Sequence, residues 1–165
     1  MRVSAPALKI PIVRTLELKV PPPAVALLLG IAMWLASAAS SPLALVLPGR
    51  RPIALVVVAL SVAIGAAGML SFRRARTTIN PTTPDAASSL VVTGIYRFTR
   101  NPMYLGFFLL LTGWAIYLAN IPAFAGPVLF VLYINRFQIA PEERALAAKF
   151  GTAFDDYRRR TRRWI

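Results

Sequence analysis

Several side chains able to take part in chemistry gather just before an apolar run in the second half of the chain. Arg97 and Arg100 precede Asn101-Pro102, and Tyr104 follows within one helical turn. Asparagine caps helices and proline fits the first helical position, so a helix is expected to start here with unpaired backbone N–H groups. Such a start attracts anionic groups. An anion-binding helix start is one interpretation of this pattern, and the local features alone favour the other, an ordinary interfacial arginine and helix cap.

Two glycines follow in the same apolar run. Gly106 and Gly113 lie seven residues apart. Because glycine has no side chain, these positions let another helix or a ligand approach the backbone closely. Helix packing and ligand contact both fit this spacing.

A pair of carboxyl groups comes after the last apolar run. Glu142 and Glu143 are two of only six acidic residues, and at helical spacing they lie near Leu146 and Phe150, which should face protein or membrane. One interpretation is that they stabilise the dipole of a first helical turn. The sharper hypothesis is a carboxylate directed at a cationic cofactor or at a substrate amine.

The chain ends in an arginine-rich stretch. Five of the six residues from Arg158 to Arg163 are arginine. Such a tail is usually solvated or bound to lipid headgroups. One of these arginines can also fold back onto a carboxylate or phosphate, and the pattern does not say which one.

Two residue types are absent, and their absence limits the chemistry. The chain has no Cys and no His. This excludes disulfides, thiolate nucleophiles, thiolate metal sites and the commonest general base. Any reaction must therefore use carboxylates, Tyr, Arg and a cofactor.

The composition indicates whether the chain folds in water or in a lipid bilayer. Hydrophobic residues make up 57% of the chain and charged residues 15%, a ratio that suits lipid-facing helices. Four apolar runs have about the length of a membrane crossing, at residues 22–41, 53–72, 102–120 and 123–139. We expect a single all-α integral membrane domain over residues 1–165. It should have about four transmembrane helices and an amphipathic cytoplasmic C-terminal helix.

Basic residues between the runs predict the orientation. The leader at residues 1–20 carries four, the first turn two, the loop at residues 73–101 five, the second turn none and the region from Arg136 onward eight. By the positive-inside rule, both termini, the long loop and the tail are cytoplasmic. The formal charge of +13 then suits anionic headgroups rather than nucleic acid. A cleaved signal peptide ending near Ala36-Ser37-Ala38 is the alternative for the first run, but three further apolar runs favour a retained helix.

The tail at residues 141–165 is expected to be a separate element. Pro141 suits the first helical position, and Gly151 is a candidate break. Apolar residues recur at helical spacing, namely Leu146, Phe150, Phe154 and Tyr157. This pattern predicts an amphipathic helix.

Two motifs together make the chain recognisable. GIYRFTRNPMYLG at 94–106 and PEERALAAKFGTAFDDYRRRTRRWI at 141–165 are separated by an apolar helical hairpin. The combination resembles the isoprenylcysteine carboxyl methyltransferase and phospholipid methyltransferase superfamily, in its small bacterial-type members. The similarity covers the second half of the chain and the preceding Asn80-Pro81 segment, whereas the first two runs match only in character.

The resemblance implies a cofactor and a site. S-adenosylmethionine would bind between the cytoplasmic ends of the last two spans and the tail helix, and a lipophilic acceptor would enter from the bilayer. The residues implied at the cofactor are Arg97, Arg100, Asn101, Pro102, Tyr104, Gly106, Glu142 and Glu143. Those implied in catalysis are Glu142, Glu143, Tyr104 and Arg100. Many members have His where this chain has Asn101, so a ring contact would become an amide hydrogen bond. No metal is implied, because the cofactor itself supplies the activated group.

The acceptor and the activity have alternatives. An isoprenylcysteine-like carboxylate, a phosphatidylethanolamine-type amine and another small isoprenoid or lipid all fit a membrane-dissolved acceptor. One rival activity is an NADPH-dependent membrane reductase of the sterol-reductase type, although such chains are far longer. The other rival is a non-enzymatic membrane protein whose basic tail binds anionic lipid.

Overall fold

The chain forms a bundle of helices. The computed structural model describes residues 17–76 and 88–165, and these contain no strand beyond an isolated bridge between Ala44 and Asn120. The all-α prediction is therefore confirmed for the described residues. The predictions for most of the leader and for the Asn80-Pro81 segment lie outside them. The α-helices are α2 (Pro22–Ala39), α3 (Arg50–Arg74), α4 (Pro102–Leu118), α5 (Ala125–Ile134), α6 (Ala140–Phe150) and α7 (Thr152–Arg160).

Three helices are long and apolar enough to cross a membrane. They are α2, α3 and the helical run from Ile121 to Phe150. Helix α4 is also apolar but has only 17 residues, at the lower end of the range of about 17–25 residues that a crossing needs. Four spans were expected from the sequence, and a crossing by α4 stays a prediction.

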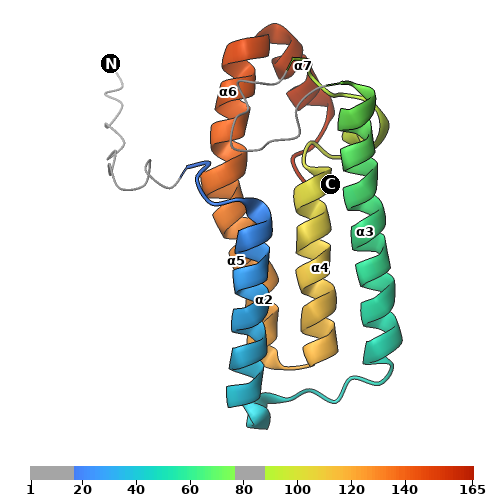
Figure 1. Ribbon diagram of the computed structural model, residues 1–165, viewed down its shortest axis with the longest axis vertical. Coiled ribbons are helices and arrows are strands. Elements are labelled where there is room, and N and C mark those ends of the chain that lie inside the picture. Colours follow the sequence, from blue (N-terminus) through green and yellow to red (C-terminus); the bar gives the residue numbers. More distant parts are fainter. Residues whose placement is uncertain (1–16, 77–87) are drawn as a thin grey trace, which may run out of the picture.

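The bundle has polar residues at both of its ends. Helices α2 and α4 begin at the end that carries α6 and α7, whereas α3 begins at the opposite end (Figure 1). Arg50 and Arg51 form the first turn of α3, and Arg73 and Arg74 form its last. Helix α3 is therefore longer at both ends than the apolar run at residues 53–72 that predicted it.

Helix α4 lies at the centre and packs most closely on α3. Both predicted glycines serve this contact. An ideal Cβ on Gly106 would lie 3.2 Å from the Ser61 carbonyl oxygen, and one on Gly113 would lie 3.2 Å from the Ala54 carbonyl oxygen. The Ser61 hydroxyl also donates a hydrogen bond to the Gly106 carbonyl at 2.9 Å. The spacing thus lets the backbones of α3 and α4 approach each other.

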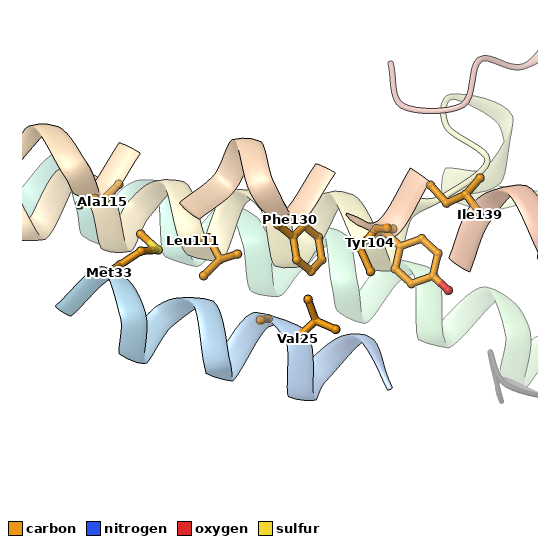
Figure 2. Packing of buried hydrophobic residues seen from close by; sticks show 10 residues of the cluster. Val25, Met33, Tyr104, Leu111, Ala115, Phe130 and Ile139 are labelled. Carbon is orange, nitrogen blue, oxygen red and sulfur yellow. The ribbon is translucent and has the colours of Figure 1, made fainter. Parts of the chain in front are cut away.

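The buried core between α2, α4 and α5 ends at a polar group. Phe130 and Ile139 are fully buried, and Tyr104 is 6% exposed in the same cluster. Figure 2 shows the Tyr104 ring beside these apolar side chains, with its hydroxyl pointing toward the Ile139 end of the bundle. The Tyr104 hydroxyl is therefore the polar group of this core that points toward the end of the bundle that carries the tail.

The closing helix continues into the tail, where the sequence predicted a separate element. Helix α5 passes through a π-helical turn, η5 (Asn135–Ile139), directly into α6, and Pro141 lies in the first turn of α6. Proline has no N–H for the carbonyl four residues earlier, which belongs to Phe137. The backbone N–H of Leu18 donates to that carbonyl instead, at 3.0 Å. The acidic pair after Pro141 is thus carried on an extension of the last span.

We predict that Gly113→Ala destabilises the bundle while Gly65→Ala does not. A Cβ on Gly113 would lie 2.8 Å from Val58 Cγ2, an overpacking that costs about 1–3 kcal/mol. A Cβ on Gly65 meets nothing within 4 Å, and alanine is the better helix former. Thermal unfolding in one detergent should show a lower Tm for Gly113→Ala alone. Equal melting of the two variants would contradict this packing.

Candidate active site

The segment that precedes α4 lies against the C-terminal segment, at the end of the bundle that carries α6 and α7 (Figure 1). The backbone N–H of Arg100 donates to the Arg162 carbonyl at 3.0 Å. The Asn101 side-chain amide and the Thr99 hydroxyl both donate to the Arg163 carbonyl, at 2.9 and 3.3 Å. These bonds fix the end of the chain beside the start of α4.

The carboxyl group of Glu143 joins both segments to α6. Arg100 Nη2 lies 2.7 Å from Oε1, and Arg163 donates to both oxygens, from Nε at 3.2 Å and from Nη2 at 2.5 Å. The side chains of Arg100 and Glu143 are 10% and 14% exposed. Charge-assisted, two-pronged bonds of this kind are among the strongest in proteins. Glu143 therefore acts as a structural junction between α4, α6 and the C-terminus.

Arg100 also closes the C-terminal end of α7. Its Nη1 donates to the Arg158 carbonyl at 3.2 Å and to the Thr161 carbonyl. The unpaired carbonyls of a helix end favour such a cation. Arg100 Nε is buried, and it has no hydrogen-bond partner among the described residues. Both Nη atoms of the guanidinium thus donate to protein acceptors, whereas the buried Nε–H has no acceptor among the described residues.

Glu142 has a different environment from its neighbour. The Tyr104 hydroxyl donates to its Oε1 at 2.6 Å. Within residues 17–76 and 88–165, no basic side chain forms an ion pair with Glu142, whereas Glu143 has two. Glu142 is therefore an acidic group without a protein counter-ion, held where the apolar core meets the polar tail.

Aromatic residues attach α7 to the loop that precedes α4. Phe154 and Tyr157 are buried together with Tyr96, which lies on the 3₁₀ turn η3 (Gly94–Arg97). The Tyr157 hydroxyl donates to the Tyr96 carbonyl at 2.8 Å. Burial raises the pKa of Tyr157, so this hydroxyl stays protonated as a donor. The chain reverses between α6 and α7 at Gly151, where φ is 52°, and the predicted break is confirmed.

The structure brings most of the predicted site residues together. Five of them belong to the clusters just described, namely Arg100, Asn101, Tyr104, Glu142 and Glu143. Pro102 is buried in the first turn of α4. Gly106 faces α3 and Arg97 is exposed on η3, so neither is part of these clusters. Contact of any of these residues with a cofactor stays a prediction.

Three residues near the site had no assigned role in the sequence. Arg163 is the tail arginine that folds back, and its target is a protein carboxylate. Trp164 Nε1 donates to Asn135 Oδ1 at 3.2 Å, which anchors the C-terminus on η5. Gln138 is fully buried and its Oε1 has no partner among the described residues. A buried amide at the end of an apolar run is the one signal that could have drawn attention to this turn.

Comparison with known proteins identifies the family. The family model for phospholipid methyltransferases matches residues 50–153, which is more than half of the chain. The chain belongs to the phospholipid methyltransferase family. The resemblance drawn from the two sequence motifs is thereby confirmed. Together with the three long apolar helices, membership makes this chain a membrane protein.

Two relatives match parts of the chain. An uncharacterised protein of Haemophilus influenzae is 44% identical over 63 residues, which is 38% of this chain and the whole of that relative. A protein-S-isoprenylcysteine O-methyltransferase of Schizosaccharomyces pombe is 36% identical over 74 residues, or 43% of this chain. That match spans only 30% of the yeast protein's length. No solved structure matches this chain.

We predict that Arg163→Gln loosens the C-terminal segment, because it removes both bonds to Glu143. The loss is on the order of 1 kcal/mol, since the Arg163 side chain is 39% exposed and partly screened. Hydrogen–deuterium exchange should rise in peptides covering residues 98–103 and 160–165. The neighbouring change Arg162→Gln, at an exposed side chain, is the matched control and should leave both peptides unchanged. Unchanged protection in Arg163→Gln would show that the junction does not hold the tail.

Proposed function

We propose that this chain is an S-adenosylmethionine-dependent methyltransferase that acts on a lipophilic acceptor dissolved in the membrane. Family membership supports methyl transfer. The observation that carries the site is Glu142, an acidic side chain bonded to Tyr104 and without a basic partner among the described residues. The proposed topology places this end of the bundle, both termini and the loop before α4 on the cytoplasmic side.

The residues present fit this cofactor. S-adenosylmethionine carries a sulfonium, an amine and a carboxylate, so a site for it needs an uncompensated acidic group and a free donor. Glu142 meets the first requirement, and the buried Nε–H of Arg100 meets the second. When bound, the cofactor supplies the activated methyl group. Glu142 and Arg100 are therefore the groups that would hold it.

The remaining work of the protein is positioning. Tyr104 fixes the orientation of Glu142, and the tail segment pinned by Glu143 would cover the bound cofactor and limit access of water. The side chains that cluster with Tyr104 in the core are apolar. They suit an acceptor that arrives from the bilayer and presents its reactive group at the Tyr104 end. Holding acceptor and methyl donor in line is the main source of acceleration that this inventory offers.

The acceptor class stays at the level of a lipophilic molecule. An isoprenylcysteine-like carboxylate, a phospholipid amine and another small isoprenoid are all consistent with an apolar approach to Tyr104. The two rival functions, an NADPH-dependent reductase and a purely lipid-binding protein, are favoured by neither comparison. Isothermal titration calorimetry with S-adenosylmethionine and with NADPH distinguishes a methyltransferase from a reductase. Binding of NADPH alone would overturn the proposal.

We predict that Glu142→Gln lowers turnover about a hundredfold or more, because it removes the one acidic group that faces the cationic cofactor. Purified protein in nanodiscs is incubated with radiolabelled S-adenosylmethionine and a total lipid extract, and the labelled product is identified. Asp156→Asn removes an exposed carboxylate from α7 and serves as the matched control, with unchanged turnover. Full activity of Glu142→Gln would remove this carboxyl group from the mechanism, and no labelled lipid with any extract would remove the proposed activity.

We predict that Tyr104→Phe lowers turnover about tenfold, because it deletes the hydrogen bond that orients the Glu142 carboxyl group. The effect should be smaller than that of Glu142→Gln, since the acidic group itself remains. Tyr133→Phe is the control, because that ring packs on Phe137 and its hydroxyl makes no hydrogen bond among the described residues. Equal losses in the two tyrosine variants would show that general packing, and not the bond to Glu142, is responsible.

A further inference from the structure

An apolar groove runs along α4 and is lined in part by core residues such as Ala26 and Leu111. It has a volume of about 990 Å³ and lies between α2 and α3, with α4 as its floor. This volume is at the upper end of the range of about 300–1,000 Å³ that small-molecule pockets occupy. Its walls include Leu27, Gly30, Trp34, Leu55 and Trp114, and its one charged lining residue is Arg51.

The groove has the depth of one leaflet. Along α2 it extends from Pro23 to Trp34, about 17 Å at 1.5 Å per residue. Half of a hydrocarbon core of about 30 Å is similar. Its charged end is formed by Arg51 in the first turn of α3 and Tyr117 in the last turn of α4, at the end of the bundle remote from Glu142. On α2 the groove begins at Pro23, in the first turn of that helix, and it runs from there toward the remote leaflet, where its charged end lies.

Arg51 has no carboxylate to pair with. The sequence contains no Asp or Glu at residues 18–84 or 86–141. The described acidic residues lie at the other end of the bundle, where Glu17, for example, pairs with Arg136 and Arg144. Trp34 and Tyr117, which line the same groove as Arg51, are the aromatic types that gather at headgroup level. The groove thus combines an apolar lining, aromatic residues of the kind found at the membrane interface and an arginine without a carboxylate partner.

We propose that this groove binds an anionic phospholipid of the remote leaflet, with an acyl chain between α2 and α3 and the headgroup phosphate at Arg51. The proposal does not rest on methyl transfer, because the headgroup position at Arg51 lies at the opposite end of the bundle from Glu142 and Tyr104. The groove is a resident lipid site that supplies the counter-ion which the protein lacks.

The charges favour a lipid over two other occupants. A second copy inserted in the same orientation would bring its own Arg50 and Arg51 to the same level and add positive charge. A methyl acceptor would present its polar group at Glu142 and leave Arg51 unmatched. Only a lipid of the remote leaflet places an anion at Arg51 and hydrocarbon along α2 together.

Photo-crosslinking tests the site directly. Protein in phosphatidylcholine nanodiscs receives a trace of phosphatidylglycerol with a photoreactive acyl chain, and mass spectrometry maps the attachment points. Crosslinks are expected on Leu27, Ile31 and Leu55, all exposed and lining the groove. Arg51→Gln should lower this labelling about fivefold, and the matched Arg50→Gln, whose side chain does not line the groove, should change it less than twofold.

A second variant keeps the test independent of charge. Gly30→Leu places a side chain in the groove, and its Cβ would meet only Leu111, at the ordinary van der Waals distance of 4.0 Å. Labelling should fall while the Tm in lipid-free detergent stays the same. Equal labelling by a phosphatidylcholine probe, equal effects of the two arginine variants, or crosslinks only between protein copies would each overturn the proposal.

Discussion

The junction around Glu143 is the interaction on which the geometry of the candidate site depends. One carboxyl group is shared by Arg100 from the segment before α4 and by Arg163 from the last residues of the chain. Buried charges are costly unless each partner is satisfied, and this arrangement supplies two cations and several carbonyl acceptors. Because Glu142 is the next residue on α6 and Tyr104 lies one turn into α4, fixing the junction also sets their approach. The residue that holds this region together is therefore the neighbour of the carboxyl group to which the proposed function assigns contact with the cofactor.

Much of the bundle follows from simple properties of the sequence. The apolar run at residues 22–41 predicts α2 closely, because an uncharged stretch of that length has few other uses. The break at Gly151 follows from a residue that adopts positive φ without strain. The approach of Glu142 to Tyr104 was expected only through the family motifs, since no local pattern brings together residues so far apart in the chain.

Other features depend on tertiary contacts that a sequence pattern does not encode. Arg163 is one of five arginines in six residues, and only the path of the C-terminus beside Asn101 selects it. The continuity of α5 and α6 was missed because Pro141 normally marks a helix start. Its missing hydrogen bond is replaced by Leu18, which is more than a hundred residues away in sequence. In both cases the deciding partner comes from a distant segment.

The unbroken run from Ile121 to Phe150 has a mechanical consequence. Glu142 is carried on the same helical run that lies among the spans, while the bonds of Glu143 to Arg100 and Arg163 hold this part of the run against the start of α4 and the C-terminal segment. Near its midpoint, the π turn of this helical run accepts a hydrogen bond from the backbone N–H of Leu18, in the segment that leads into α2. Helix tilt responds to the thickness of the surrounding bilayer. The position of Glu142 is thereby connected to the tilt of the last span, and through that tilt to the thickness of the host membrane.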